Sequence, residues 1–182
     1  MPSTSASERP PAAGARVWIF AYGSLMWRPG FDHEQVLDAW LHGYHRSLCV
    51  YSWVHRGTRE RPGLVLGLDR GGSCRGRALG IAPEQEPEIL RYLDARELVT
   101  NVYERRRLQV ITAAGRLPAW GYVVRRGHEQ YAGKLETARV VELVRRGQGQ
   151  SGACRDYLVS TVAHLEELGI LDGPLHALVK DL

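Results

Sequence analysis

Apolar residues are spaced differently along this chain from one segment to the next, and the spacing divides it into elements. The run VWIFAY at residues 17–22 is almost continuously bulky and apolar, which predicts a buried strand. The run ends at two small residues, Gly23 and Ser24. This turn is either an ordinary strand exit or a place where a ligand meets the backbone.

Later segments predict five further strands and several helices. Apolar residues at helical spacing indicate a helix over residues 33–41, so the chain is expected to open with a strand, a turn and a helix. Further helices are predicted at 83–99, 135–146 and 153–168, with a short one closing the chain. The five strand-like segments are 44–54, 63–69, 74–82, 102–112 and 118–125, the last two forming a hairpin around residues 114–115.

Strands gathered early and helices gathered late favour the α+β class over an alternating parallel sheet. The chain has 182 residues, which suits one domain with a sizeable core. We therefore expect a single α+β domain at 16–182, with a small mixed or antiparallel six-stranded sheet and flanking helices. Residues 1–15 are rich in Pro, Ser and Ala and predict a disordered tail without the features of a secretory signal.

Composition and charge narrow the classes of molecule that this protein is expected to bind. The net charge of +4 suits a small anionic ligand. The only dense basic run, residues 105–107, lies in a predicted strand whose side chains alternate faces, so no nucleic-acid surface is expected. No apolar run approaches the roughly 20 residues that span a bilayer. Three widely spaced cysteines without a C-x-x-C pair favour a reducing, cytoplasmic setting.

Glu97 is the strongest candidate for chemistry. It follows Ile89 and Leu93 at intervals of four, so it lies at the end of an apolar helical stripe. Partial burial and the negative end of the helix dipole would both raise the pKa of its carboxyl, as proton transfer near neutral pH requires. Alternatively, the helix frays there and Glu97 pairs with Arg96 or a strand arginine in water.

Two other segments carry weaker signals. GQGQSG at residues 147–152 matches a dinucleotide-binding pattern, but a helix precedes it where a strand is required, so it is interpreted as a loop. Tyr157 lies on the following predicted helix, at a position whose spacing is typical of a residue that packs in the core.

The turn after the first predicted strand offers backbone donors. The amides after Gly23 could hold a carboxylate or oxyanion. Ser24 lacks the G-x-S-x-G context of a nucleophile and is better suited to hydrogen bonding.

No metal site is expected. His42, His45 and His55 are loosely spaced, no cysteine joins them, and the first two are predicted to straddle a change from helix to strand.

Four segments occur in the order found in the ChaC family of γ-glutamylcyclotransferases, and the resemblance covers residues 17–168. The segments are FAYGSLMW, HRGTRERPGLVLGL, YLDARE and GQGQSGACRDYL. Resemblance to this family implies a compact fold with a partly closed, barrel-like sheet. It also implies cleavage of glutathione to 5-oxoproline and cysteinylglycine without a metal or organic cofactor.

The resemblance assigns roles to individual positions. Glu97 matches the catalytic glutamate and Tyr157 a tyrosine that lines the pocket, while Cys154 stands where many relatives have Asn. The residues that match substrate-binding segments are Tyr22, Gly23, Ser24, Leu25, His55 and Arg56.

The implied chemistry needs no nucleophile from the protein. The α-amine of a γ-glutamyl compound can close on its own side-chain carbonyl, and Glu97 would act first as base and then as acid. Two alternatives stay open: turnover of other γ-glutamyl peptides or amines, and a regulatory binding protein linked to cation transport.

Overall fold

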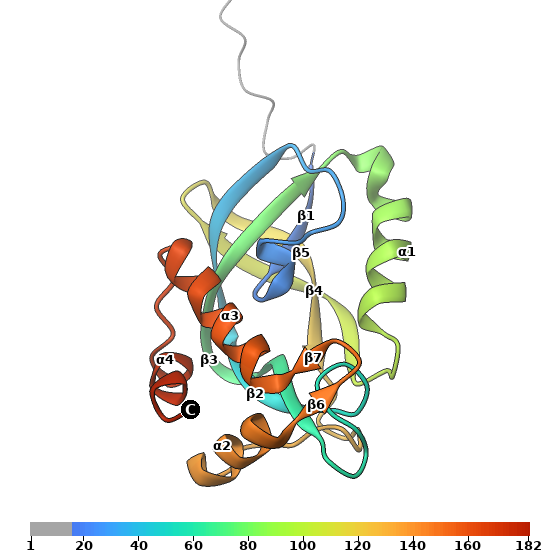
Figure 1. Ribbon diagram of the computed structural model, residues 1–182. Helices are drawn as coiled ribbons and strands as arrows, with labels where there is room; N and C mark the ends of the chain where they lie inside the picture. Colours follow the sequence, from blue (N-terminus) through green and yellow to red (C-terminus); the bar gives the residue numbers. More distant parts are fainter. Residues whose placement is uncertain (1–15) are drawn as a thin grey trace, which may run out of the picture.

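The computed structural model describes residues 16–182, so the predicted tail at 1–15 lies outside the described residues. Five strands form a closed barrel in the order β1-β3-β2-β4-β5 (Figure 1). Their bounds are β1 Val17–Ala21, β2 Gln35–Ser52, β3 Gly63–Ile81, β4 Tyr103–Thr112 and β5 Gly115–Val124.

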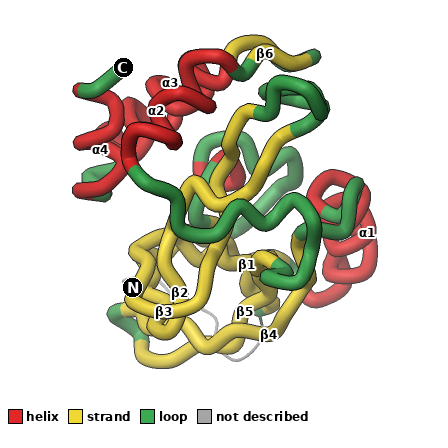
Figure 2. Tube along the Cα trace, turned by 90° about the horizontal axis from the view of Figure 1, so that it is seen from below, coloured by secondary structure: helices red, strands yellow, loops and turns green. Residues whose placement is uncertain are grey.

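Helices flank the barrel on two sides. In Figures 1 and 2, α1 lies along one flank, whereas α2, α3 and α4 gather on another. The helices are α1 Glu86–Glu97, α2 Thr137–Arg146, α3 Cys154–Glu167 and α4 Gly173–Lys180. Two 3-10 turns, η1 Ser24–Met26 and η2 Pro83–Gln85, and a small hairpin of β6 Gln148–Gly149 and β7 Gly152–Ala153 complete the set. The later predicted helices and the β4–β5 hairpin are thereby confirmed.

The barrel is mixed because β1 has two kinds of neighbour. It runs antiparallel to β3 over residues 77–81 and parallel to β5, where Trp18 lies opposite Ala119. β2 and β3 form the longest antiparallel pair. A short contact of Trp40 with Ile111 joins β2 to β4 and completes the closure.

The helix predicted over residues 33–41 is wrong, because this segment forms the first part of β2. Ala39 and Leu41 are buried at alternate positions, as expected for a strand with one face toward the barrel interior. Val36 and Trp40, which produced the helical spacing, are 40% and 45% exposed. Apolar side chains on the outer face therefore imitated a helical stripe. His42 and His45 consequently lie on one strand and do not straddle a helix boundary.

The segments predicted as strands at 63–69 and 74–82 form one strand, β3, so the barrel has five strands and not six. Gly71 and Gly72 between them have φ of +98° and +68° and lie at a register shift between His42 and Tyr44. The glycines accommodate a bulge in the ladder where the sequence predicted a break between two strands. The α+β class and the barrel-like sheet are confirmed.

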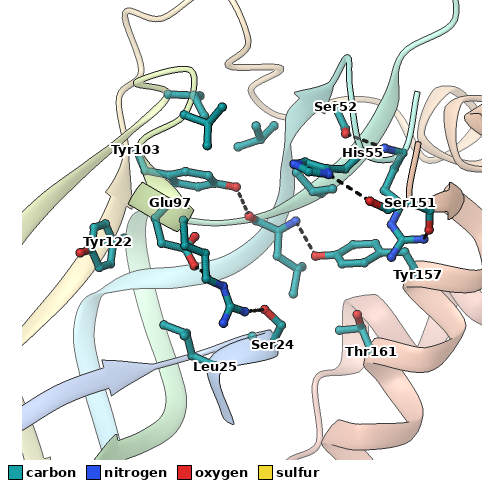
Figure 3. A pocket seen from close by; sticks show the side chains of 18 of the residues that line it. Ser24, Leu25, Ser52, His55, Glu97, Tyr103, Tyr122, Ser151, Tyr157 and Thr161 are labelled. Atoms are coloured by element: carbon teal, nitrogen blue, oxygen red, sulfur yellow. Dashed lines mark hydrogen bonds and ion pairs between the residues drawn. The ribbon is translucent and has the colours of Figure 1, made fainter. Parts of the chain in front are cut away.

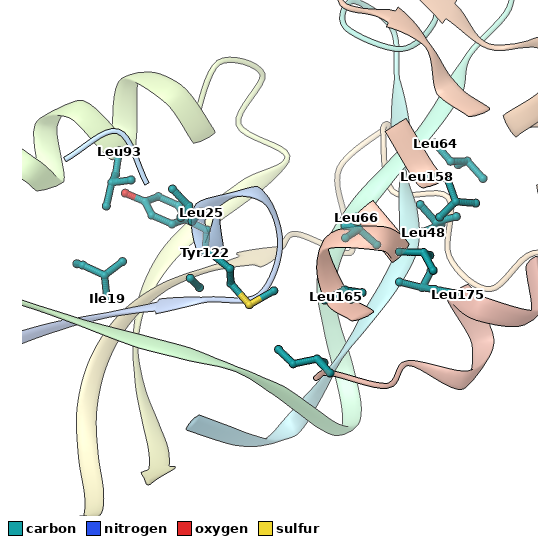
Figure 4. Packing of buried hydrophobic residues seen from close by; sticks show 14 of the residues in the cluster. Ile19, Leu25, Leu48, Leu64, Leu66, Leu93, Tyr122, Leu158, Leu165 and Leu175 are labelled. Atoms are coloured by element: carbon teal, nitrogen blue, oxygen red, sulfur yellow. The ribbon is translucent and has the colours of Figure 1, made fainter. Parts of the chain in front are cut away.

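One buried apolar cluster joins the helices to the barrel (Figure 4). Leu93 of α1 lies near Leu25 and Tyr122, while Leu158 of α3 lies near Leu64. Each such side chain contributes about 1.5–3 kcal/mol when fully buried. The packing therefore places the C-terminal end of α1 and the N-terminal end of α3 against the barrel. Within residues 16–182, no helix combines the length and apolarity needed to cross a membrane.

Candidate active site

A cavity of about 840 Å³ opens where the barrel meets α1 and α3. Its walls come from the turn after β1, the end of β2 and the loop after it, the start of β3, the end of α1 and the start of α3 (Figure 3). All the candidate residues from the sequence line it: Tyr22, Gly23, Ser24, Leu25, His55, Arg56, Glu97 and Tyr157. Cys154 does not line the cavity.

The turn after β1 forms one wall. β1 ends at Ala21, and Ser24–Met26 makes a single 3-10 turn in which the Met26 amide donates to the Gly23 carbonyl over 2.9 Å. Leu25 is buried and anchors this turn in the core. The first amides of a helical turn have no partner within the turn, so those of Ser24 and Leu25 are available to other acceptors.

The C-terminal end of α1 is fixed to the barrel on one side by Asp94. Its carboxylate accepts hydrogen bonds from the hydroxyl of Tyr122 at 2.7 Å and from the guanidinium of Arg105 at 2.5 Å. Leu93 beside it is fully buried. These contacts hold the last turn of the helix, so Glu97 at its end has a defined place.

Glu97 lies at the end of an unfrayed helix, mostly buried, and it also pairs with Arg96. Its side chain lies in the cavity and is 21% exposed, and Oε1 lies 3.3 Å from Nε of Arg96. Burial raises the pKa of the Glu97 carboxyl above its ordinary value, and Arg96 acts in the opposite direction. The predicted upward shift is confirmed, and burial is its main cause. The resulting group is suited to accepting and returning a proton.

Three phenols surround this carboxyl. Burial raises the pKa of Tyr157 to about 12 and carries the pKa values of Tyr22 and Tyr103 well above 10. Repulsion by the charge of Glu97 contributes to all three shifts. The three hydroxyls therefore stay neutral at neutral pH and can only donate or accept hydrogen bonds.

The backbone of one residue, Leu66, orients two of these phenols. The amide of Leu66 donates to the Tyr157 hydroxyl over 3.1 Å, and the Tyr103 hydroxyl donates to the carbonyl of Leu66 over 2.6 Å (Figure 3). Tyr157 thus keeps its own proton for donation, while the oxygen of Tyr103 keeps lone pairs for acceptance. Sequence reasoning missed Tyr103, since nothing in its spacing distinguishes it from a packing residue of a strand.

His55 and Arg56 bind the glycine-rich segment that forms the far wall. Nδ1 of His55 lies 3.0 Å from the hydroxyl of Ser151, and the Arg56 guanidinium donates to the carbonyls of Ser151 and Ala153. Arg56 also lies over the ring of Tyr157, with 5.3 Å between its Cζ and the ring centre. Both residues reach the cavity, but these contacts are with the protein itself.

The glycine-rich segment requires its glycines because it packs backbone to backbone. A Cβ on Gly147 would lie 2.6 Å from the carbonyl oxygen of Arg56, and one on Gly149 would lie 2.5 Å from the carbonyl carbon of His55. The pattern in GQGQSG is thus explained by close packing against the loop after β2.

Cys154, the first residue of α3, has a structural contact. Its buried sulfur accepts from the Leu64 amide over 3.3 Å and donates to the Leu64 carbonyl over 3.1 Å. The thiol therefore makes polar contacts with the backbone of β3.

Within the part of the chain that the structure describes, no three His, Cys, Asp or Glu side chains come together as a metal site. The cysteines at 49, 74 and 154 are all unpaired and buried.

Comparisons with known proteins agree with this architecture. A crystal structure of a γ-glutamylcyclotransferase specific to glutathione from yeast superposes with a TM-score of 0.81 at 21% identity, covering 91% of this chain and 95% of that one. The fold is therefore that of the γ-glutamylcyclotransferases. The family model for ChaC-like proteins matches residues 17–182.

Curated proteins are also similar to this chain in amino-acid sequence. The glutathione-specific γ-glutamylcyclotransferase of Escherichia coli K12 is 32% identical over 164 residues, which are 90% of this chain and 71% of that protein. The human glutathione-specific γ-glutamylcyclotransferase 1 is 29% identical over 180 residues, 92% of this chain and 81% of that protein. These relatives are enzymes. The chain belongs to the ChaC-like family.

Proposed function

We propose that this protein is a glutathione-specific γ-glutamylcyclotransferase in which Glu97 is the general base and then the general acid. The observation that carries the proposal is the Glu97 carboxyl itself, whose pKa burial raises, held in a cavity among three neutral phenols. The names of the curated relatives support glutathione as the substrate. The three buried, unpaired thiols support the cytosol as its location.

The reaction rearranges bonds within the substrate. The carboxylate of Glu97 takes a proton from the α-ammonium group, and the freed nitrogen attacks the γ-glutamyl carbonyl carbon to close a five-membered ring. The bond from that carbon to the cysteine nitrogen then breaks. The lactam nitrogen keeps one of the three ammonium hydrogens, and the other two end on the released amine of cysteinylglycine. Glu97 returns to its ionised form, so no oxidant, metal or second substrate is consumed.

The cavity offers complementary groups for this substrate. The turn amides after Gly23 suit the α-carboxylate or the developing oxyanion, because they carry partial positive charge. Tyr157 can donate to a substrate oxygen, and Tyr103 can accept from the α-ammonium group. Holding the amine near the carbonyl supplies much of the rate, since intramolecular reactions gain several kcal/mol from proximity.

The decisive experiment follows 5-oxoproline released from glutathione by the purified protein. Wild type should release it, and Glu97→Gln should reduce kcat by about 10²- to 10⁴-fold, because the base is lost while the shape is kept. Glu88→Gln is the matched control, since Glu88 is an exposed glutamate of the same helix. A fully active Glu97→Gln would contradict the assigned base.

Substrate range is tested in the same assay. If γ-glutamyl-alanine or γ-glutamyl-lysine turns over while glutathione does not, the protein is a cyclotransferase for other γ-glutamyl peptides or amines. Absence of turnover for all three would favour the regulatory binding protein linked to cation transport.

A further inference from the structure

The guanidinium of Arg96 lies between Glu97 and the turn after β1. Nη2 donates to the hydroxyl of Ser24 over 2.8 Å, and Nη1 donates to the carbonyl of Arg28 over 2.8 Å. On its other side, Nε lies 3.3 Å from Oε1 of Glu97. The same Nη1 also lies 3.4 Å from the carbonyl of Pro29 and 3.3 Å from the hydroxyl of Tyr92.

This side chain joins two parts of the site that are far apart in sequence. Ser24 and Arg96 are separated by 72 positions. The planar fork of an arginine can direct its N–H groups to several acceptors at once, which the single ammonium of a lysine cannot do in the same geometry. Arg96 is only 26% exposed, so its contacts are partly shielded from solvent.

Arg96 is also the charged group that acts on the Glu97 carboxyl. Burial raises the pKa of Glu97, and the positive charge of Arg96 opposes that rise. The groups that face Glu97 from other elements are the phenols of Tyr22, Tyr103 and Tyr157. The remaining titratable side chains of the cavity wall are Arg28, Tyr51, His55, Arg56, Tyr122 and Asp156.

We propose that Arg96 is a positioning residue for the cyclisation, which holds the ionised carboxylate of Glu97 in register with the Ser24 turn. This inference rests on the proposed function. Without the guanidinium, the backbone of Glu97 keeps its place at the end of α1, but the carboxylate loses both its neighbouring charge and its hydrogen-bonded link to the turn. The base and the substrate-binding wall then no longer share a fixed geometry.

Two variants and a control test the role. Arg96→Gln should lower kcat for 5-oxoproline release by about 10- to 100-fold, because small misplacements of reacting groups cost up to roughly 10²-fold. The acidic limb of its pH–rate profile should move to higher pH, since the group that favours ionised Glu97 is gone. Arg96→Lys should return the acidic limb to its wild-type pH, because the positive charge is kept, but it should restore only part of kcat. Arg91→Gln, an exposed arginine of the same helix, should match wild type.

The pH profile separates positioning from mere folding. An Arg96→Gln variant with an unshifted acidic limb, or an Arg96→Lys variant with full kcat, would overturn the proposal. If Arg96→Gln does not fold, Arg96→Lys and Ser24→Ala provide the test. Both should lower kcat, by up to about tenfold, because each weakens the link from Glu97 through Arg96 to Ser24. Wild-type kcat in both variants would overturn it.

A measurement without substrate keeps this inference separate from the proposed function. The carbon-13 signal of the Glu97 side-chain carboxyl is titrated in wild type and in Arg96→Gln. Its midpoint should move to higher pH in the variant. If wild type fails to release 5-oxoproline but the midpoint moves, the proposed function fails while the Arg96–Glu97 coupling stands. An unchanged midpoint in an active enzyme would overturn the coupling alone.

Discussion

The amide of Leu66 in β3 donates to the hydroxyl of Tyr157 in α3, with 3.1 Å between the two atoms. In this part of β3, β2 pairs with one edge, whereas β1 pairs with the other edge only at residues 77–81. The first residues of β3 therefore have an edge without a neighbouring strand. Side chains from α3 and β4 meet the backbone groups there, and so the edge of the sheet becomes a wall of the cavity.

Tyr157→Phe tests the role of that hydroxyl. The variant keeps the aromatic ring and loses one donor to the substrate, so kcat/KM for glutathione should fall about tenfold, as expected for one hydrogen bond. The melting temperature should change little, because the Leu66 amide can then meet water in the cavity. Tyr44→Phe, in β2 away from the cavity, is the control. An unfolded Tyr157→Phe would show instead that the hydroxyl is needed for packing.

Cys154→Ala should destabilise the protein by about 1–3 kcal/mol, because the buried amide and carbonyl of Leu64 lose their partner. Cys154→Ser keeps a donor and an acceptor and should lose less. Urea unfolding measured by circular dichroism gives both values. Equal losses for Ala and Ser would mean that the sulfur contributes by volume and not by hydrogen bonding.

Removing the buried charge of Glu97 should stabilise the fold in a pH-dependent way. The folded-state pKa of this carboxyl lies above its ordinary value of 4.5, so ionisation costs more in the folded state than in the unfolded chain. That penalty is absent below the unfolded pKa, grows as pH rises to the folded pKa, and is complete above it. Glu97→Gln should therefore raise the free energy of unfolding at neutral pH but not below 4.5.

Denaturant unfolding over a series of pH values checks this expectation, with Glu88→Gln as the exposed control on α1. A gain of equal size at every pH would point to improved packing and would contradict a charge-based cause.

The ion pair of Arg46 and Asp172 should be important for stability because it is buried. The two side chains are 3% and 12% exposed and lie 3.0 Å apart. The Arg46 guanidinium also donates to the carbonyls of Tyr22 and Arg75 at 2.6 and 2.7 Å. Asp172→Asn leaves the arginine charge buried without its counter-charge, and should lower the free energy of unfolding by about 3 kcal/mol.

Glu129→Gln is the matched control for that pair. Glu129 lies 3.6 Å from Arg59, and both side chains are about two-thirds exposed, at 64% and 67%. Its loss should cost less than about 1 kcal/mol. Chemical unfolding measures both losses of unfolding free energy. Similar losses for Asp172→Asn and Glu129→Gln would show that burial does not make the Arg46–Asp172 pair more important for stability.

Much of the fold could be predicted from local pattern. The β4–β5 hairpin and the helices after β3 follow from spacing and turn residues, and these segments form the predicted elements. Residues 35–41 could not be assigned in this way, because Val36 and Trp40 remain apolar on an exposed face. Local spacing does not record which face a neighbouring strand covers.

By itself, the sequence determined that Glu97 ends an apolar stripe and that a small-residue turn follows the first strand, since both depend on neighbours along the chain. Three features depended on the tertiary structure: the pairing of β1 with β5, the hydrogen bond from Arg96 to Ser24, and the contacts of two phenols with Leu66. At Leu66, Tyr157 accepts from the amide and Tyr103 donates to the carbonyl. Hydrogen bonds and burial arise between segments far apart in sequence, and only packing around a common core brings those segments together.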